Sequence, residues 1–268
     1  MDLISTKINR TCSKCGKPFE AKIFRVGERE ASLDTCPLCR EKEREAENIE
    51  LAEQELSEAI KEQRLSWHLK SGIELKYQSK TFDNFERSRQ PKAFDAVKKY
   101  KSGSMVLLSP SGPEGYGIGK THLVCALANH LIETAAPASY RNGSYYVVIH
   151  PCPVHFTREA SLLSRIRQTF NQDGETDEAI YSQLSKVPLL IIDDVGKVRP
   201  KDLSFTQSVY FRVIDDHYNN EKPIILTTNL LLDELEAHIG GACADRLREM
   251  AGVKGFVKMK GQSFRREL

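Results

Sequence analysis

The chain contains three short, continuous apolar runs separated by longer segments of mixed polarity. The runs cover residues 105–108, 187–194 and 223–229, they are rich in Val, Ile and Leu, and the last two end in polar residues. Runs of this length are typical of strands in a parallel sheet that is buried on both faces. A glycine-rich stretch and a further apolar segment, 122–129, follow the first run and predict a loop and a helix. This order predicts an α/β fold with a parallel sheet flanked by helices.

Residues 40–69 have a different pattern, with no glycine or proline and many Glu, Lys, Ala and Gln residues. Apolar side chains recur there at intervals of three to four, at Ile49, Ala52, Leu56, Ala59 and Ile60. This spacing predicts an amphipathic helix, which Ser71 and Gly72 should end. We favour a solvated linker helix; the alternative is a contact helix for a partner or a second copy of the chain. Trp67 is expected to seat this helix on the following domain.

Length and charge narrow the class of protein. The chain has 268 residues, enough for one large and one small domain. Lys and Arg number 39 and Asp and Glu 37, for a net charge of +2, which excludes a histone-like protein but not a local basic patch. Apolar runs are too short for a membrane span, and the first residues lack the apolar region of a secretory signal. We therefore expect a cytoplasmic protein without membrane association.

Four cysteines form two C-x-x-C pairs near the N-terminus, Cys12 with Cys15 and Cys36 with Cys39. Two such pairs about 20 residues apart match the pattern of a four-thiolate zinc site. Two disulfides are the first alternative, disfavoured in a reducing cytosol, and a C-x-x-C redox site is the second. Four thiolates leave no open coordination position, so the predicted Zn²⁺ site is structural.

The glycine-rich stretch ends in Gly-Lys-Thr directly before the predicted helix, which is the arrangement of a phosphate-binding loop. Gly115, Gly117 and Gly119 let backbone N–H groups approach phosphate oxygens. Lys120 is expected to reach the β- and γ-phosphates of ATP, and Thr121 to ligate Mg²⁺. The alternative is a glycine-rich turn that binds no nucleotide.

The loop departs from the usual G-x-x-x-x-G-K-T spacing. That spacing requires glycine at position 114, where this chain has Glu114, and Gly112 and Gly115 flank the position. The loop is therefore predicted to be two residues longer than usual or locally shifted. This affects its first turn and leaves the Gly-Lys-Thr chemistry in place.

Polar residues at the ends of the second and third apolar runs complete a nucleotide site. Asp193 is expected to hold the Mg²⁺ shell and Asp194 to orient or deprotonate the attacking water. Asn229 would lie near the γ-phosphate if its strand is inserted beside the strand before the phosphate loop. The alternatives are a helix-capping Asp pair and a strand-terminal turn at Asn229.

In this order, the motifs resemble the AAA+ ATPases of the DnaC/IstB-like group, the bacterial helicase loaders and transposition helpers. The resemblance covers residues 77–268 and rests on segments 80–85, 117–123, 156–170, 191–196, 226–230, 244–250 and 262–265. It implies an ATP-driven switch that acts on a replicative helicase or on DNA. It also implies an oligomer in which an arginine of one subunit reaches the ATP of its neighbour. Arg246 is the first choice for that role and Arg248 the second, although either could be a surface ion-pair residue.

The C-terminal segment 254–266 is basic with interleaved aromatic residues, which is compatible with contacts to single-stranded DNA. We favour a final edge strand, because Val257 and Met259 alternate with Lys258 and Lys260. Two arginines on the helix before the second apolar run, Arg165 and Arg167, form a weaker candidate patch.

We therefore predict a zinc module over residues 1–40, a charged helical linker over 41–76 and an AAA+ core over 77–268. The zinc module is similar to the helicase-contacting module of some loaders. The predicted function is that of a Mg²⁺-dependent ATPase that loads a replicative helicase and is a homo-oligomer when ATP is bound. The alternative is a helper ATPase for a transposase. Asp193 and Asp194 argue against a scaffold that binds nucleotide without hydrolysis.

Overall fold

The structure is a computed structural model that describes residues 6–26, 29–141, 146–170, 174–197 and 203–264. Internal contacts divide the chain into two units. The smaller comprises Met1–Ile60 and Ala138–Ile149, and the larger comprises Lys61–Pro137 and His150–Leu268. The two cysteine pairs lie in the smaller unit, and the glycine-rich loop with the apolar strands lies in the larger.

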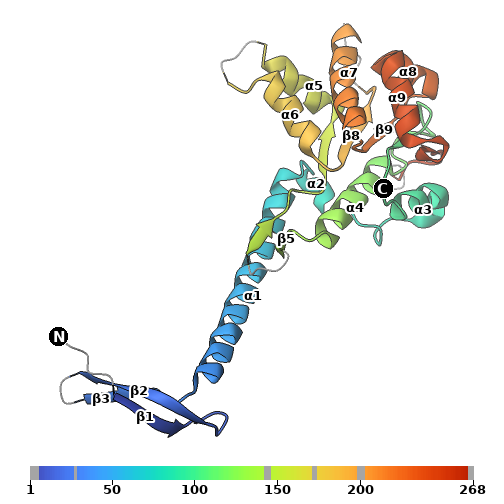
Figure 1. Ribbon diagram of the computed structural model, residues 1–268. Coiled ribbons are helices and arrows are strands. Elements are labelled where there is room, and N and C mark those ends of the chain that lie inside the picture. The colour runs from blue at the N-terminus through green and yellow to red at the C-terminus, as the bar shows by residue number, and fades with distance from the viewer. Residues whose placement is uncertain (1–5, 27–28, 142–145, 171–173, 198–202, 265–268) are drawn as a thin grey trace. The chain divides into compact units, whose positions relative to one another are not determined.

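The smaller unit contains two antiparallel sheets that the sequence patterns did not predict (Figure 1). One has the order β1-β2-β3 and consists of β1 (Thr6–Thr11), β2 (Pro18–Val26) and β3 (Arg29–Ser32). The other pairs β5 (Ala138–Tyr140) with β6 (Val147–Ile149). Since the pairing of Thr11 with Pro18 closes the β1–β2 hairpin, Cys12 and Cys15 lie in its connection.

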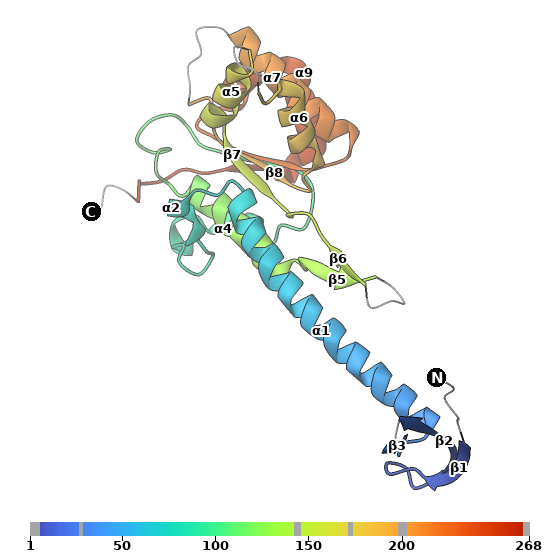
Figure 2. The same ribbon diagram turned by 90° about the vertical axis from the view of Figure 1, so that its left-hand side faces the viewer.

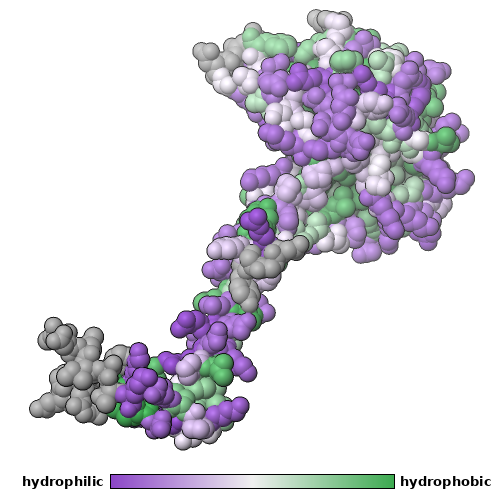
Figure 3. Space-filling view, viewed as in Figure 1, coloured by the Kyte–Doolittle hydropathy of each residue, from purple (hydrophilic) through white to green (hydrophobic). Residues whose placement is uncertain are grey.

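The predicted linker helix is confirmed as α1 (Pro37–Lys70), which begins three residues earlier than expected. Pro37 suits the first helical position, where a backbone N–H has no partner inside the helix. The helix ends before Gly72, whose φ is 75° and where a Cβ would lie 2.1 Å from the carbonyl oxygen of Phe156. Trp67 is 1% exposed and its Nε1 donates to the carbonyl of His150 at 3.2 Å, as expected for a seat on the larger unit. Much of the α1 surface in Figure 3 is hydrophilic.

A five-stranded parallel sheet forms the centre of the larger unit, and it confirms the three predicted strands (Figure 2). Its order is β10-β4-β9-β8-β7, with β4 (Met105–Leu108), β7 (His155–Arg158), β8 (Leu190–Val195), β9 (Ile224–Thr228) and β10 (Phe256–Lys258). The strand β9 lies between β4 and β8, as the predicted position of Asn229 requires. The strand β10 is at an edge, as predicted from its alternating pattern.

Helices cover both faces of this sheet. One face packs against the end of α1, α2 (Leu75–Gln78), α3 (Pro91–Lys98) and α4 (Lys120–Thr134). The other packs against α5 (Glu159–Gln168), α6 (Asp177–Lys186), α7 (Leu203–Asn219), α8 (Leu232–Ile239) and α9 (Gly241–Ala251). Short 3₁₀ turns occupy Arg87–Arg89 and Val253–Gly255. Among the described residues, no helix combines the length and apolar character that a membrane span needs.

Successive residues of the central strands alternate between the two faces. On β8, Leu190 and Ile192 join the core beneath α5–α9, while Ile191 joins the core beneath α4. Burial on both faces explains why the strands appear in the sequence as continuous apolar runs. Because all five strands are parallel, the polar residues that follow β4, β8 and β9 meet at one edge of the sheet.

Candidate nucleotide site and metal centre

Lys120 lies at the first position of α4, directly after the glycine-rich loop, and is 6% exposed. Its Nζ donates to the hydroxyl of Ser109 at 2.6 Å and to the carbonyl of Gly115 at 2.9 Å. Burial lowers the pKa of Lys120 to about 8, and the nearby carboxylates of Asp194 and Asp193 oppose that shift. The ammonium group is therefore held inside the loop with neutral oxygens as its direct partners.

Two glycines of the loop occupy positions that exclude a side chain. Gly119 has φ of 94°, and a Cβ there would lie 2.6 Å from the ring of Phe85. A Cβ on Gly115 would lie 1.7 Å from the carbonyl oxygen of Pro110. Gly117 also has a positive φ, of 70°. These contacts explain the spacing of the glycines, because the loop has to turn tightly to bring Lys120 back over its own backbone.

The predicted lengthening of the loop is accommodated in a turn at its beginning. The N–H groups of Gly115 and Tyr116 both donate to the carbonyl of Gly112, at 3.1 Å each. Glu114 lies inside this turn, and the Tyr116 side chain is 53% exposed. The unusual spacing is thus confined to residues before Gly117, and the segment from Gly119 continues into α4 as predicted.

A C-terminal segment after β10 holds this lengthened loop. The N–H of Gly261 donates to the carbonyl of Glu114 at 2.9 Å, and that of Phe264 to the carbonyl of Gly117 at 3.0 Å. The guanidinium of Arg89 lies 4.6 Å from the centre of the Phe264 ring. In each contact the two residues lie more than 140 positions apart in the chain, so no local sequence pattern indicates the contact.

Asp193, at the end of β8, is fully buried. Its carboxylate accepts hydrogen bonds from the hydroxyls of Thr121, at 3.0 Å, and Thr227, at 2.5 Å. Burial, followed by the charge of Asp194, raises the pKa of Asp193 to about 6. A buried carboxylate beside a threonine hydroxyl offers the hard oxygen ligands that Mg²⁺ prefers, so the residues fit the predicted ion.

Asp194 lies at an irregularity of β8, where the register with β9 shifts between Ile192 and Val195. Its φ is 59°, in the left-handed region, and its N–H donates to the Thr227 hydroxyl at 3.0 Å. Its partly exposed carboxylate lies 2.9 Å from the Nζ of Lys197. The shift interrupts the strand alternation directly after Asp193, so the two neighbouring carboxylates have different environments: one fully buried, the other open to solvent.

Asn229 follows β9 and points to the same two oxygens as Lys120. Its Nδ2 donates to the Ser109 hydroxyl at 3.0 Å and to the Gly115 carbonyl at 2.9 Å. The fold therefore brings the glycine-rich loop, Lys120 and Asn229 together, as expected from the position of β9 in the sheet.

The two candidate arginines lie on α9 in contacts within the same chain. Arg246 forms an ion pair with Asp215 of α7 at 2.8 Å, and its guanidinium lies over the rings of Phe211 and Tyr218. Arg248 pairs with Glu236 at 2.5 Å and with Asp245 at 2.8 Å. No contact between either arginine and the residues around Lys120 is recorded within the described part of the chain.

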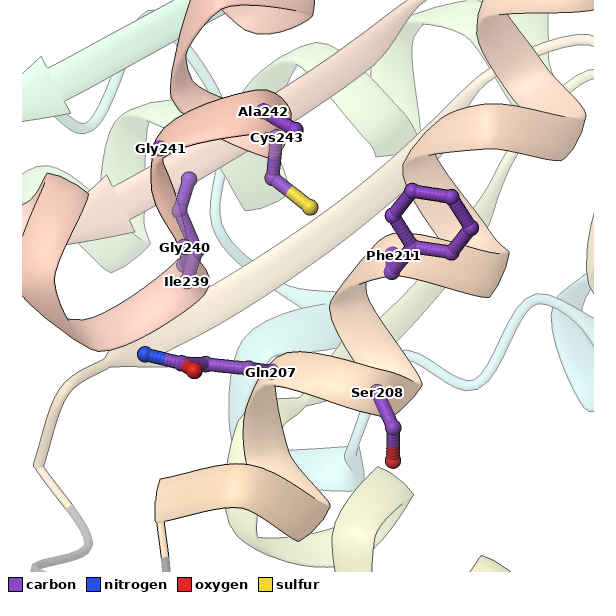
Figure 4. A pocket seen from close by; sticks show the side chains of 8 residues that line it. All are labelled: Gln207, Ser208, Phe211, Ile239, Gly240, Gly241, Ala242 and Cys243. Carbon is purple, nitrogen blue, oxygen red and sulfur yellow. The ribbon is translucent and has the colours of Figure 1, made fainter.

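A separate hollow of about 410 Å³ lies between α7 and the junction of α8 with α9 (Figure 4). It is lined by Gln207, Ser208 and Phe211 of α7 and by residues 239–243, which comprise the end of α8, Gly240 and the first turn of α9. None of the predicted nucleotide-site residues contributes to its lining.

In the smaller unit, the structure brings Cys12, Cys15, Cys36 and Cys39 together, with all four sulfurs within 4.8 Å of one another. The sulfurs of Cys15 and Cys36 are 3.8 Å apart. A tetrahedral ion with Zn–S bonds of about 2.3 Å requires sulfurs about 3.8 Å apart, so the cluster fits zinc. The N–H groups of Cys36 and Cys39 donate to the sulfurs of Cys12 and Cys36, at 3.3 and 3.4 Å.

The thiols of this cluster do not share one pKa. Backbone N–H groups of Cys15 and Cys36 lower the pKa of Cys12 to about 6, because they stabilise its thiolate. Hydrogen bonds with the side chains of Cys36 and Cys15 raise the pKa of Cys39 to about 12. Four thiolates at this separation repel one another, so only a bound cation would allow all four to ionise at neutral pH.

The segment after α9 contains the edge strand that its pattern favoured, and several basic residues considered for DNA contact have partners within the chain. Val257 and Met259 are buried while Lys258 is exposed, as expected for an edge strand, and Lys260 pairs with Glu114 at 2.9 Å. Arg165 pairs with Glu175, and the Arg167 guanidinium lies 4.9 Å from the centre of the Phe205 ring. Arg265 and Arg266 lie outside the described residues.

Sequence reasoning missed a buried polar group beside the nucleotide site. Glu159 at the start of α5 is fully buried and contacts Tyr210, His238 and the N–H of Gly196. A glutamate in the first turn of a helix is common, so the sequence contains no signal for this contact.

Comparisons with known proteins agree with the fold and the motifs. The chain is 26% identical over 184 residues to the replicative helicase loader DnaC of Escherichia coli K12, covering 67% of each chain. It is 27% identical over 198 residues to the replicative helicase loader DnaC of Buchnera aphidicola subsp. Baizongia pistaciae, covering 72% of each.

Solved structures show the same fold. The crystal structure of the DnaC helicase loader superposes with a TM-score of 0.52 at 19% identity, covering 70% of this chain and 100% of that one. The crystal structure of DnaI gives a TM-score of 0.50 at 18% identity, covering 70% and 94%. The family model of the IstB-like ATP binding protein matches residues 51–267. The chain therefore belongs to the IstB-like ATP-binding protein family, and its larger unit has the AAA+ fold of the helicase loaders.

Proposed function

We propose that this protein is an ATP-hydrolysing loader of a replicative helicase. The observation that carries the proposal is the convergence of Lys120, Thr121, Asp193 and Asn229 at one edge of the parallel sheet. The two relatives reported above are replicative helicase loaders, which supports a role in DNA replication.

Each residue has a distinct task in this proposal. Lys120 neutralises the β- and γ-phosphates of ATP, and Thr121 and Asp193 hold Mg²⁺, which when bound supplies positive charge to the phosphates. Asp194 accepts a proton from the attacking water or orients it. Asn229 positions the same water and senses the γ-phosphate. In the free protein the Asp194 carboxylate forms an ion pair with the Nζ of Lys197 at 2.9 Å.

The assembly follows the same reasoning. A zinc module over residues 1–40 contacts the helicase, a linker over 41–76 connects it, and the core over 77–268 hydrolyses ATP. ATP-bound subunits form a homo-oligomer in which Arg246, or otherwise Arg248, acts on the ATP of the neighbour. Single-stranded DNA is a further ligand. This work would take place in the cytoplasm.

The alternative function is a helper ATPase for a transposase, and the matching family model, which carries the IstB name, favours it. Both functions use the same nucleotide site. They differ in the partner protein, so the partner decides between them.

The test combines hydrolysis with partner capture, using the full chain. Phosphate release is measured for the wild type and for Asp194→Asn, which should bind ATP but hydrolyse it about 10²–10⁴-fold more slowly. The chain, loaded with a non-hydrolysable ATP analogue, is then presented to the replicative helicase and the transposase of its host. Helicase capture with ATP turnover supports the loader, whereas transposase capture supports the alternative. A wild type without turnover rejects the ATPase in both.

A further inference from the structure

A fully buried carboxylate lies next to the nucleotide site without taking part in the chemistry proposed above. Glu159 opens α5 directly after β7, whose last residue, Arg158, pairs in register with Asp193. The Glu159 side chain has no exposed surface. A buried carboxylate is costly unless hydrogen bonds stabilise it, so its partners indicate why it is kept there.

Three donors from separate elements satisfy Glu159. Tyr210 of α7 donates its hydroxyl to Oε1 at 2.8 Å, and Nε2 of His238 on α8 lies 2.6 Å from the same oxygen. The backbone N–H of Gly196 donates to Oε2 at 2.8 Å. The two side chains thus hold one carboxylate oxygen, and the other is directed at the backbone that follows β8.

The backbone at Gly196 belongs to the turn that presents Asp194. Both residues have positive φ, 59° at Asp194 and 79° at Gly196, and the N–H of Lys197 donates to the carbonyl of Asp194 at 3.2 Å. A Cβ on Gly196 would lie 2.2 Å from a methyl of Leu230. The turn is therefore tight, and a non-glycine residue in the left-handed region needs surrounding contacts to stay there.

We propose that Glu159 is a positioning residue for ATP hydrolysis: it fixes the Gly196 N–H and thereby the left-handed turn that aims the Asp194 carboxylate. This inference rests on the proposed role of Asp194 in orienting water. Tyr210 and His238 hold Glu159 from α7 and α8, so the direction of Asp194 depends on how these helices pack against the sheet. Glu159 itself touches neither nucleotide nor water.

A purely structural role for Glu159 would give a different result from a positioning role. A structural residue changes the stability of the fold and leaves the rate of hydrolysis per folded molecule unchanged. A positioning residue instead changes the rate of hydrolysis at saturating ATP. ATP affinity should stay constant, because the hydrogen-bond partners of Glu159 are Tyr210, His238 and Gly196 and not the residues of the glycine-rich loop. It also has no further effect once Asp194 has lost its carboxylate.

The experiment compares Glu159→Ala, Glu159→Gln and Tyr210→Phe in the full chain. Glu159→Ala leaves the Gly196 N–H without its acceptor, and kcat should fall by about 10–100-fold, the size expected for a displaced catalytic group. Glu159→Gln keeps one acceptor oxygen and should recover part of that loss. Tyr210→Phe removes one of three donors and should have the smallest effect. ATP affinity should stay within about twofold of the wild type in all three.

Two controls separate positioning from instability. Ile214→Ala, fully buried on α7, lowers stability without removing a hydrogen bond of the carboxylate, and its kcat below the unfolding temperature should equal that of the wild type. In an Asp194→Asn background, Glu159→Gln should cause no additional loss. If Glu159→Ala does not fold, Glu159→Gln and Tyr210→Phe carry the test.

The outcomes distinguish this inference from the proposed function. An active wild type with unchanged kcat in Glu159→Ala, or in both Glu159→Gln and Tyr210→Phe where Glu159→Ala does not fold, overturns the positioning role and leaves the ATPase intact. Losses from Glu159→Gln and Asp194→Asn that add in the double variant overturn it as well. A wild type that binds ATP without hydrolysing it overturns the proposed function, and with it the reaction that Glu159 is proposed to serve.

Discussion

At the scale of single residues, the nucleotide site contains two ionisable groups whose pKa values are displaced toward their neutral forms. Burial lowers that of Lys120 to about 8 and raises that of Asp193 to about 6. Burial is the main cause of both shifts, because it removes each charge from water; the charge of Asp194 adds to the rise at Asp193 and opposes the fall at Lys120. A bound triphosphate would place negative charge beside Lys120, and a bound Mg²⁺ would place positive charge beside Asp193. Binding of both should therefore stabilise the folded protein.

The Asp193 shift predicts how stability depends on pH. Its pKa rises from 3.8 to about 6 on folding, so between these values the folded state keeps a proton that the unfolded state has lost. The free energy of unfolding therefore falls as pH rises through this window, by about 3 kcal/mol in total at 1.36 kcal/mol per unit. Asp193→Asn lacks this loss. We expect it to gain about 2 kcal/mol relative to the wild type between pH 4 and pH 7, because part of the change occurs below pH 4.

Urea unfolding of both proteins at pH 4, 5, 6 and 7 without nucleotide measures this difference. The other carboxylates titrate in both proteins, so their contributions cancel in the comparison. Adding Mg²⁺ and ATP at pH 7 should raise the stability of the wild type more than that of Asp193→Asn. A stability difference that stays constant across the pH range would contradict the assigned burial of the charge.

Lys120→Ala should abolish detectable ATP binding and leave the fold intact. Charged hydrogen bonds contribute about 1.5–3 kcal/mol each, so losing two phosphate contacts lowers affinity by at least about 100-fold. Titration with a fluorescent ATP analogue measures the affinity, and circular dichroism checks the fold. Lys186→Ala, an exposed lysine on α6, is the matched control. Equal affinities for the two variants would reject the phosphate-binding loop.

At the scale of elements, the C-terminal segment should act on ATP binding through the lengthened loop. Phe264 donates its N–H to Gly117, and its ring packs near Gly119 and Phe85. Phe264→Ala would leave the loop less ordered before ATP arrives, and ordering it on binding costs about 1–2 kcal/mol. We expect ATP affinity to fall about tenfold with kcat at saturating ATP unchanged.

Val253→Ala is the control for this variant, because Val253 belongs to the same C-terminal region and is 96% exposed. It should bind ATP as the wild type does. If Phe264→Ala also binds ATP normally, the contacts with the loop have no role in shaping the nucleotide site.

The ion pair between Arg246 of α9 and Asp215 of α7 provides a control for the proposed trans-acting role of Arg246. Arg246→Ala should lose hydrolysis and bind ATP normally, and mixing it with Asp194→Asn should restore activity at shared interfaces. Asp215→Asn breaks the ion pair of Arg246 but keeps the arginine, so it is the matched control. If Arg246 only attaches α9 to α7, both variants should show the same loss of stability and similar turnover, and the mixture should show no rescue.

The elements differ in how far the sequence predicts them. The strands β4, β8 and β9 were predictable because burial on both faces leaves continuous apolar runs, and the loop because glycine spacing reflects steric limits. The contact of Phe264 with Gly117 and the contact of Glu159 with Gly196 were not predictable. Each joins residues far apart in the chain through a backbone N–H group, which no side-chain pattern reveals. The contacts of Arg246 within its own chain were also not predictable, because the sequence does not reveal whether an arginine pairs within its chain or with a neighbouring subunit.

At the scale of the whole molecule, the two units differ in what stabilises them. The larger unit has apolar cores on both faces of its sheet. Of the side chains described before residue 40, only Cys12, Ala21 and Cys36 are buried and hydrophobic. These three small side chains bury little apolar area compared with the two cores of the larger unit. Metal binding at the four cysteines would add folding energy to the β1–β3 region.

We expect one zinc ion per chain, bound by the four cysteines, to supply that energy. Chelation or Cys36→Ser should then unfold the β1–β3 region and leave ATP binding at Lys120 unchanged, because the larger unit has cores of its own. Hydrogen exchange, read separately over residues 6–40 and over β4 and β8, follows both regions in one sample, and Cys125→Ser provides a control for cysteine loss outside the cluster. Capture of the helicase, measured on the same material, should be lost with the metal while hydrolysis continues. Protein purified under reducing conditions without zinc would reject the metal site, whereas helicase capture that survives zinc loss would reject only the contact role of the module.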